Sequence, residues 1–398
     1  MRPDDRATLI TELQRVLTDR LKVWGSIRTA PVEEAFRAVP RHLFIDRYYD
    51  GDRLVYVDPE RPTERQLRRI CSDDALVSHR RRKVPTSSTS QPGLVAGMLE
   101  QLRLEPGMNV LEIGAGTGWN AALIGHIVGP QGRVHAIDIQ EDVARVAREH
   151  LSRAGASNVT VIAGDGGHGH ANAAPFDRIV TTAACPELCP RWAQQLAAGG
   201  ALLVTLRDMP GSTWCLNLLL HRRAQCLRGE VVGTSGFMAL QGEFGTHAAQ
   251  HEVGDRLERL TAGRKARTQP ATWAYLGLPE RSLRYLLGEL ALFCQLEGLH
   301  VELVGSRHAM VDPDTGDACV IDADGVEAFG GDGALERLRA STRRWIELGA
   351  PRRDCYRVEA WPPEVTKRAP GDGWLLRRRH TQLIFRLKER SRANTRPW

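Results

Sequence analysis

The segment at residues 110–121, VLEIGAGTGWNA, joins a short apolar run to a glycine-rich turn and then to the start of a helix. Gly114, Gly116 and Gly118 carry no Cβ atom, so the turn can adopt positive φ angles and a ligand can approach its main chain closely. The helix that follows would direct its free N–H groups at that ligand. The segment therefore predicts a strand–turn–helix unit that can hold a ligand through its backbone, although a tight turn without a ligand has the same pattern.

The next apolar run, RVHAIDI at residues 133–139, contains Asp138. Asp138 lies roughly 20 residues after the glycines, which is the distance at which nucleotide-binding βαβ units place an acid on the ribose hydroxyls. The turn reads E-x-G-x-G-x-G and lacks the G-x-G-x-x-G pattern that cradles a pyrophosphate. The acid at Glu112 instead suits a ligand with an ammonium or sulfonium group. The pattern favours S-adenosyl-L-methionine over a nicotinamide dinucleotide, which stays the alternative.

Short apolar runs alternate with helical or glycine-rich connections along the middle of the chain, at residues 108–113, 133–138, 158–163, 177–182 and 201–206. This alternation predicts an α/β fold, a Rossmann-like doubly wound, mostly parallel sheet covered by helices on both faces. Strand-like runs at residues 214–221 and 226–233 predict an antiparallel pair at its edge.

The chain divides into three predicted parts: N-terminal helices and a substrate loop (1–92), a ligand-binding core (93–245), and a smaller C-terminal α+β domain (246–398). The helices and strands of the last part are expected at residues 279–298, 300–304, 318–321, 334–348, 354–361 and 381–387. The first part is expected to hold helices at 5–21 and 32–44, an irregular segment at 50–83 and a hydroxyl-rich loop at 85–92.

Two motifs resemble parts of metal sites, but neither of them contains a full set of metal ligands. Residues 312–317, DPDTGD, lack the glycine and the distal Glu of a calcium loop, so a hairpin turn is predicted there. Cys185 and Cys189 form a C-x3-C pair without a second pair, and the eight cysteines are scattered along 398 residues. We therefore expect reduced cysteines and no metal.

Charge and hydropathy limit the location of the protein and the kinds of partner that it is expected to bind. No apolar run approaches 18 residues and the first residues include acids, so we expect neither a membrane span nor a secretory signal, and a cytoplasmic location. Residues 351–398 hold 13 Lys and Arg against 5 Asp and Glu, an excess larger than the net charge of +6 of the whole chain. Without an RNA-binding signature, this basic segment is more typical of a solvated face or of one that binds an acidic peptide than of a nucleic-acid site.

Residues 32–240 resemble the protein-L-isoaspartate O-methyltransferase family of S-adenosylmethionine enzymes. The resemblance is collinear and rests on VEEAFRAVPRHLF (32–44), STSQP (88–92), VLEIGAGTGWN (110–120), GRVHAIDI (132–139), VTVIAGDGGHG (159–169), APFDRIVTTAACPELCPRWAQQLAAGGALLVTL (174–206) and FMALQGEF (237–244).

The resemblance implies S-adenosyl-L-methionine as cofactor, with the glycines at its methionine part, Asp138 at its ribose and Asp165 with Gly166 at its adenine. The cofactor-binding residues predicted in this way are Glu112, Gly114, Gly116, Asn120, Asp138, Ile139, Asp165 and Gly166. The residues predicted to contact the substrate carboxylate are Ser88, Thr89, Ser90 and Gln91, with Ser90 as the family's main hydroxyl residue. A plain Asp-Gly turn at Asp165 and a helix N-cap at Ser90 remain the structural alternatives.

The implied reaction needs orientation more than acid–base chemistry. A carboxylate is already nucleophilic at neutral pH and a sulfonium is already activated, so no base is required. In-line positioning can contribute on the order of 7 to 11 kcal/mol. Hydroxyl donors orient a carboxylate without neutralising it, whereas a Lys or Arg at that place would weaken the nucleophile.

Two departures from the family pattern affect the expected substrate. Thr89 stands where the family has an apolar residue, and a segment from about residue 250 onward is expected to have no counterpart in the repair enzymes. Extended members that modify ribosomally made peptides, such as lanthipeptides and graspetides, resemble the chain in this respect. They esterify an Asp side chain, which closes to an aspartimide and can hydrolyse to isoaspartate.

The first hypothesis is therefore methylation of an Asp in a precursor peptide that the C-terminal segment and the basic run at residues 79–83 recruit. For the basic run, a solvated loop is the alternative. Repair of isoaspartyl proteins is the alternative. An RNA or small-molecule methyltransferase is a second alternative, although TTAA at residues 181–184 replaces the N-P-P-Y type of motif for amino-nitrogen methylation. A non-catalytic binding protein on the same fold is a third.

Overall fold

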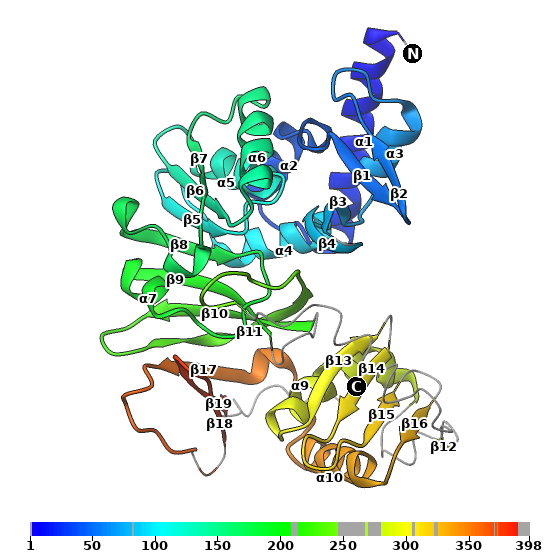
Figure 1. The fold of residues 1–398 in the computed structure, drawn as a ribbon, viewed down its shortest axis with the longest axis vertical. Helices are drawn as coiled ribbons and strands as arrows, with labels where there is room; N and C mark the ends of the chain where they lie inside the picture. Colours follow the sequence, from blue (N-terminus) through cyan, green and yellow to red (C-terminus); the bar gives the residue numbers. More distant parts are fainter. Residues whose placement is uncertain are drawn as a thin grey trace.

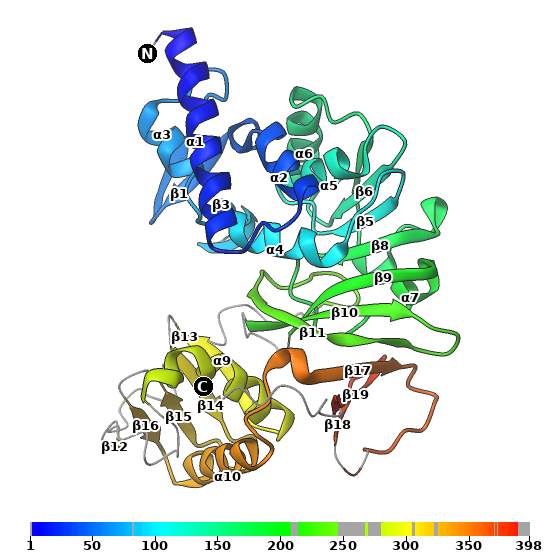
Figure 2. The same ribbon diagram turned by 180° about the vertical axis from the view of Figure 1, so that it is seen from behind.

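The computed structural model describes residues 2–81, 83–207, 214–245, 267–269, 280–304, 307–321, 325–369, 371 and 373–388. Figure 1 shows the N-terminal helices (blue) at one end, a long central sheet (cyan to green, continued in orange and red) in the middle, and a second sheet with two helices (yellow) at the other end. The view from behind shows the same order (Figure 2).

The central sheet has ten strands in the order β18-β19-β17-β11-β10-β9-β8-β5-β6-β7. The pairs among β5 to β9 are parallel, and the pairs from β9 outward to β18 are antiparallel. The strands are β5 (Asn109–Ile113), β6 (Arg133–Asp138), β7 (Val159–Ala163), β8 (Phe176–Thr181), β9 (Leu196–Arg207), β10 (Trp214–Arg222), β11 (Leu227–Gly236), β17 (Tyr356–Trp361), β18 (Gly373–Arg377) and β19 (Gln382–Leu387). The predicted Rossmann-like α/β sheet is confirmed, and β10 and β11 form the predicted antiparallel pair. This pair does not lie at the edge, because β17, β19 and β18 continue the sheet beyond it.

Helices bury both faces of the parallel part. Val110 and Leu111 are successive residues of β5 that belong to different buried clusters, as expected for a strand whose two faces are both covered. The helices of this part are α4 (Pro92–Leu102), α5 (Trp119–Val128), α6 (Glu141–Arg153) and α7 (Pro190–Gln195), with the short 3-10 helices η2 (Gly166–His168) and η3 (Ala171–Ala173).

The N-terminal part contains more regular structure than its sequence suggests. Its elements are α1 (Pro3–Val23), α2 (Ala30–Ala38), η1 (Arg41–Phe44), β1 (Arg47–Asp50), β2 (Arg53–Tyr56), α3 (Glu64–Ile70), β3 (Leu76–Arg81) and β4 (Val84–Thr89). The prediction of an irregular segment at residues 50–83 is wrong, because it holds β2, α3 and β3. The predicted loop at 85–92 is wrong over its first half, where β4 pairs with β3.

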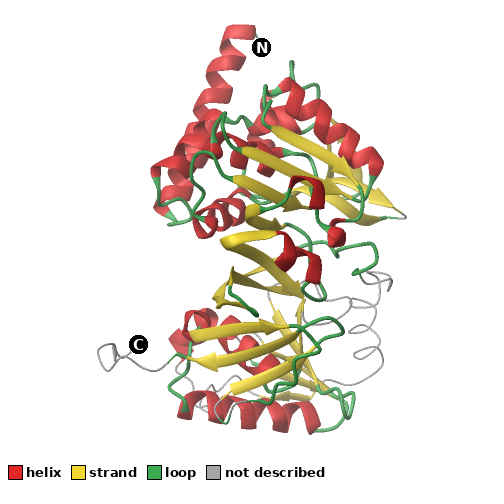
Figure 3. Cartoon of the chain, turned by 90° about the vertical axis from the view of Figure 1, so that its left-hand side faces the viewer, coloured by secondary structure: helices red, strands yellow, loops and turns green. Residues whose placement is uncertain are grey.

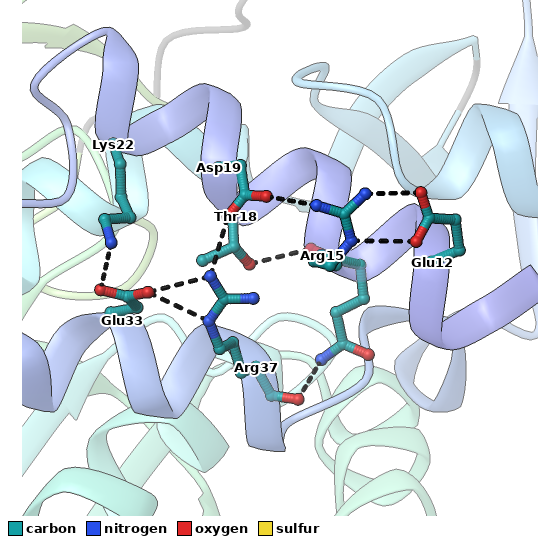
Figure 4. Close-up of polar contacts among 8 residues, drawn as sticks. Glu12, Arg15, Thr18, Asp19, Lys22, Glu33 and Arg37 are labelled. Atoms are coloured by element: carbon teal, nitrogen blue, oxygen red, sulfur yellow. Dashed lines mark hydrogen bonds and ion pairs between the residues drawn. The ribbon is translucent and has the colours of Figure 1, made fainter. Parts of the chain in front are cut away.

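An ion-pair network joins the first two helices (Figure 4). Arg37 of α2 contacts Asp19 of α1 at 2.8 Å and Glu33 of its own helix at 2.9 Å, and Lys22 of α1 reaches Glu33 at 2.7 Å. Arg15 continues the network along α1, with Glu12 on one side and Asp19 on the other. These side chains are partly exposed, so the network orients α2 against α1 while contributing little to stability.

The C-terminal region contributes to two sheets. A five-stranded antiparallel sheet, β12-β16-β15-β14-β13, packs with α9 and α10, and the chain then returns to the central sheet as β17 to β19 (Figures 1 and 3). The elements of the smaller sheet are β12 (Arg267–Gln269), α9 (Glu280–Leu296), β13 (His300–Val304), β14 (Arg307–Val311), β15 (Ala318–Ile321), β16 (Val326–Phe329) and α10 (Gly333–Glu347), followed by η5 (Arg353–Cys355). The hairpin turn predicted at residues 312–317 is confirmed between β14 and β15.

The predicted domain boundaries stay a prediction. The sheet order shows in addition that residues after 355 extend the central sheet. No helix in the described part of the chain is long and apolar enough to cross a membrane. The predicted boundary segment at residues 243–270 lies mostly outside the described residues.

Candidate functional site

A cavity of about 800 Å³ lies at the carboxyl ends of β5, β6, β8 and β9. Its wall comes from β4 and the turn before it, the glycine turn after β5, the end of β6, the end of β8 and the segment that follows β11. Ligands in open α/β sheets bind at this edge. Its volume is in the upper range of sites for small organic molecules.

The glycine turn brings main chain into contact with β4. Gly114 and Gly116 have φ angles of 104° and 53°, which residues with a Cβ rarely adopt. A Cβ on Gly116 would lie 3.1 Å from the carbonyl oxygen of Ser88, and one on Gly114 would lie 2.9 Å from Thr182 Oγ1. The predicted strand–turn–helix unit is present, with Gly118 preceding the first residue of α5.

Glu112 places a buried carboxyl group on the cavity wall beside this turn. Its Oε1 accepts a hydrogen bond of 2.7 Å from Asn120 Nδ2, whereas Oε2 has no partner among the described residues. Burial raises the pKa of Glu112 to about 8. A buried acid with an unsatisfied oxygen matches a cationic group of a ligand, because such a group would supply the missing partner.

Asp138 ends β6 on the same wall, as predicted. Its Oδ2 accepts from the Gly116 N–H at 3.0 Å and its Oδ1 from the Gln140 N–H at 3.1 Å. Burial raises the pKa of Asp138. Each oxygen of the Asp138 carboxylate keeps a lone pair that can accept a hydrogen bond from a hydroxyl group. The half-exposed Ile139 follows Asp138 on the cavity wall.

Asp165 and Gly166 differ in position. Gly166 lies on the cavity wall, while the Asp165 carboxylate accepts from the Gly167 N–H at 2.8 Å and from the Glu243 N–H at 2.7 Å. The geometry of Asp165 is therefore that of the capping turn considered as its alternative. Trp192 Nε1 donates to the Gly166 carbonyl oxygen at 2.9 Å, which fixes this part of the wall.

The predicted substrate residues Ser88, Thr89, Ser90 and Gln91 all lie on the wall. Thr89 Oγ1 is 3.1 Å from Thr117 Oγ1, and Gln91 Nε2 donates to Asp73 at 3.0 Å. The N-cap alternative for Ser90 is wrong, because Gln91 occupies that position without a side-chain capping bond. Both Ser88 and Ser90 therefore remain candidates for orienting an acceptor.

Two further hydroxyl groups of β4 extend this strip. Thr86 and Ser87 line the cavity, and their hydroxyl oxygens are buried without a hydrogen-bond partner among the described residues. The sequence analysis missed them because it took the substrate contacts only from residues 88–91 and treated the segment as a loop. Successive side chains of a strand point to opposite faces, so Thr86 and Ser88 lie on one face of β4 and Ser87 lies on the other, and residues of both faces line the cavity.

Arg41 is a buried residue that holds the end of this strip and that the sequence analysis also missed. Its guanidinium donates to the carbonyl oxygens of Ile70, Ser72, Asp74, Thr89 and Ser90, at 2.7 to 3.3 Å. It also lies 5.1 Å from the centre of the Trp119 ring. Desolvation lowers the pKa of Arg41 to about 10, so it stays charged at neutral pH. It positions the residues before α4 and does not line the cavity.

The opposite wall connects the cavity to the C-terminal region. Thr234, at the end of β11, accepts a hydrogen bond of 3.1 Å from Arg353, whose Nε donates to the buried Glu289 of α9 at 2.6 Å. Beyond Thr234, the wall segment pairs with Ala184, whose N–H donates to the Met238 carbonyl oxygen at 2.7 Å. Among the described residues no group of three or more His, Cys, Asp and Glu side chains is arranged to hold a metal.

Comparison with known proteins places these features in context. The family model described as Protein-L-isoaspartate(D-aspartate) O-methyltransferase matches residues 12–225. The protein-L-isoaspartate O-methyltransferase of Pyrococcus horikoshii is 38% identical over 187 residues, which cover 47% of this chain and 74% of the relative. That of Hyperthermus butylicus is 34% identical over 242 residues, 59% of this chain and 90% of the relative.

A solved structure with the name protein-L-isoaspartate O-methyltransferase has a similar fold. Its TM-score is 0.52 at 22% sequence identity, and the match covers 87% of this chain and 96% of that chain. Residues 1–250 alone cannot supply such a share of this chain. The expectation that the region after residue 250 has no counterpart in a protein of this name is therefore wrong.

Proposed function

Because the chain belongs to the protein-L-isoaspartate O-methyltransferase family, we propose that it transfers a methyl group to the carboxylate of an Asp or isoAsp residue in a peptide or protein. S-adenosyl-L-methionine is the cofactor. The observation that supports this most directly is the Glu112 carboxyl group, buried on the cavity wall with one oxygen unpartnered.

The residues of the cavity fit this cofactor. Glu112 would bind its ammonium group, the main chain at Gly114 and Gly116 would contact its methionine part, and Asp138 would accept from its ribose hydroxyls. When bound, it supplies a methyl group on a positively charged sulfur, which an acceptor oxygen can take while the carbon–sulfur bond breaks. No proton has to leave the acceptor carboxylate.

The chain's own contribution is orientation. The hydroxyl groups of β4 and of Ser90, the residue after it, would hold the acceptor carboxylate in line with the methyl group. The guanidinium of Arg41 would keep the end of this strip in place through its contacts with the main chain. Because Thr89 contacts Thr117, the orienting role falls to Ser88 and Ser90.

The finer proposal concerns the acceptor. We infer that it is an Asp in a ribosomally made precursor peptide, methylated on the way to an aspartimide and an isoaspartate. The support is the position of Lys83, the last residue of the basic run, on the rim of the cavity. Repair of isoaspartyl proteins is the second candidate, and the names of the relatives favour it.

The deciding experiment offers matched acceptors to the protein. Peptides of one sequence with Asp or isoAsp at one position are incubated with S-adenosyl-L-methionine, and mass spectrometry follows a methyl ester and the later loss of methanol. Transfer to the isoAsp peptide alone would support repair. If neither of these two peptides nor a precursor peptide is methylated, the proposal is contradicted.

A binding measurement tests the cofactor assignment independently. Calorimetric binding of S-adenosylhomocysteine should be lost in Asp138→Ala and kept in Asp142→Ala, because Asp142 is an exposed acid of α6 outside the cavity. Equal binding by both variants would contradict the role of Asp138.

A further inference from the structure

A chain of buried contacts leads from α6 through the glycine turn to the hydroxyl strip formed by β4 and Ser90. His150 of α6 is 1% exposed, and its Nδ1 lies 2.9 Å from the main-chain carbonyl oxygen of Thr117 in the turn. The hydroxyl oxygen of Thr117 lies 3.1 Å from that of Thr89 in β4. Both threonines are buried on the cavity wall. His150 therefore contacts the turn assigned to the cofactor, and the turn contacts the strip assigned to the acceptor.

The second ring nitrogen of His150 connects the same side chain to the N-terminal part of the chain. Its Nε2 lies 2.8 Å from Oδ2 of Asp46, which stands between η1 and β1, and Arg153 donates to the other carboxylate oxygen at 2.9 Å. Burial opposes the charge of Asp46, but the hydrogen bonds and charges of His150 and Arg153 outweigh this effect and lower the pKa of the carboxyl. Asp46 is therefore an ionised acceptor at neutral pH.

These two partners determine where the protons of the His150 ring are. A carbonyl oxygen and a carboxylate oxygen only accept hydrogen bonds, so both bonds form only when both ring nitrogens carry a proton. His79 of β3, which interacts electrostatically with His150, adds no positive charge, because burial lowers its pKa to about 4. His150 is thus an imidazolium that donates to Asp46 on one side and to the glycine turn on the other.

We propose that His150 is a positioning residue for methyl transfer, which acts through Thr117 and Thr89 to fix the cofactor turn relative to the acceptor strip. This inference rests on the proposed function. In-line transfer depends on the distance and angle between the acceptor oxygen and the methyl group, and a misplacement of about 1 Å can cost about 100-fold in rate. His150 does not line the cavity, so its effect should appear in kcat and cofactor affinity more than in the KM for the peptide.

Two variants of His150 separate its two bonds. The side-chain N–H of Asn reaches the place of Nδ1 and that of Gln the place of Nε2, so His150→Asn can keep the bond to Thr117 and His150→Gln the bond to Asp46. Each variant loses one buried hydrogen bond, so urea unfolding should show a similar loss of stability in both. Thr89→Val removes the hydroxyl contact to Thr117. His126→Gln is the matched control at an exposed position of α5.

Methyl transfer gives kcat and KM, and calorimetry with S-adenosylhomocysteine gives cofactor affinity without reaction. We expect His150→Gln to lower kcat by about tenfold or more and cofactor affinity by about threefold or more, with the KM for the peptide within about twofold. His150→Asn should keep both kcat and affinity close to native. Thr89→Val should lower kcat and keep the affinity, because it releases the acceptor strip from the turn. His126→Gln should match the native protein.

NMR of the protein with 15N-labelled histidine tests the proton count at pH 7. The native spectrum should contain one ring with slowly exchanging protons on both nitrogens, and both His150 variants should lack this signal. A His150 ring with one unprotonated nitrogen would overturn the double contact.

The outcomes separate this inference from the proposed function. Native kcat and affinity in His150→Gln, or an equal loss in His150→Asn, would overturn the positioning role and leave the methyltransferase proposal intact. If no peptide is methylated but cofactor affinity is lower in His150→Gln and native in His150→Asn, the role of His150 in holding the turn is supported and the proposed reaction is contradicted. If no peptide reacts and both variants bind S-adenosylhomocysteine as the native protein does, both proposals fail.

Discussion

Glu112 is the residue whose ionisation most distinguishes the folded chain from the unfolded one at the site. Its pKa is raised to about 8 in the folded protein, against an ordinary value of 4.5. The folded state therefore holds a proton that the unfolded state loses, and stability should fall as the pH rises from about 4.5 to about 8 and then level off. A buried carboxyl with this shift corresponds to a change of a few kcal/mol in the free energy of unfolding.

The prediction for Glu112→Gln is a flatter pH profile. Urea unfolding of the ligand-free protein between pH 5 and 9 should show the variant gaining stability relative to the native chain as the pH rises. Glu105→Gln, at an exposed position before β5, should follow the native profile. Parallel curves for Glu112→Gln and the native chain would mean that Glu112 is ionised in the folded protein.

The same carboxyl links cofactor binding to proton release. Near pH 7 most of the free protein holds Glu112 protonated, and an ammonium group favours the charged form. Binding of S-adenosylhomocysteine should therefore release close to one proton, measured by calorimetry in buffers of different ionisation enthalpy, and Glu112→Gln should release none from this source. An equal release in both proteins would assign the proton to another group.

Arg41 supports a second prediction at the scale of a single side chain. Replacing it by Leu would leave carbonyl oxygens of three segments without their donor, and each buried unsatisfied group costs about 1 to 3 kcal/mol. We expect Arg41→Leu to lower the free energy of unfolding by about 2 to 4 kcal/mol, measured in urea, and Arg65→Leu at an exposed position of α3 to change it little. A native-like Arg41→Leu would mean that water replaces the guanidinium.

At the scale of helices and strands, the contact between α1 and α2 combines apolar packing with the ion-pair network of Figure 4. Arg37→Ala removes the contacts to Asp19 and Glu33. The midpoint of urea unfolding should decrease slightly at low salt and by less in 1 M salt, since partly exposed charges are screened. Arg145→Ala, which removes one pair within α6, is the control, and a salt-independent loss would indicate packing by the aliphatic part of Arg37.

The predicted and observed elements agree where burial leaves a clear pattern in the sequence. The parallel strands are covered on both faces and therefore appear as continuous apolar runs, which made β5, β6 and β8 recognisable. β4 was missed because its residues, VPTSST, are polar and proline-containing, and its pairing with β3 is what makes it a strand. α3 had a readable signal, the Thr63 and Gln66 capping box, that the sequence analysis did not use.

The residues of the candidate site also fall into two groups, those that the sequence pattern revealed and those that it did not. Residues of the glycine turn and Asp138 were found because their chemistry depends on local spacing. Arg41 and Arg353 were missed because their partners are far away in the sequence, up to 49 residues for Arg41 and 119 for Arg353. A side chain that acts through distant carbonyl or hydroxyl groups leaves no pattern in one sequence.

At the scale of the whole molecule, the central sheet connects the C-terminal region to the rest of the chain, in addition to the contact at the site. β17 pairs with β11 over Leu227 to Glu230, and β19 and β18 continue the same sheet. Phe385, Tyr356 and Val358 of these strands are buried in the same cluster as Leu111 of β5. The region after residue 350 therefore completes the core of the methyltransferase part, although the smaller sheet separates it in sequence.

This arrangement makes a prediction about truncation. A chain that ends at residue 245 would expose the edge of β11 and the apolar side chains that β17 and β19 cover, so it should unfold at a lower urea concentration and bind S-adenosylhomocysteine more weakly than the full chain. It would also lose the bond from Arg353 to Thr234 on the cavity wall. A chain that ends at residue 388 keeps every strand of the sheet and serves as the control. If the shorter chain were as stable as the control and bound the ligand equally well, β17 to β19 would be an attachment to a core that is complete without them.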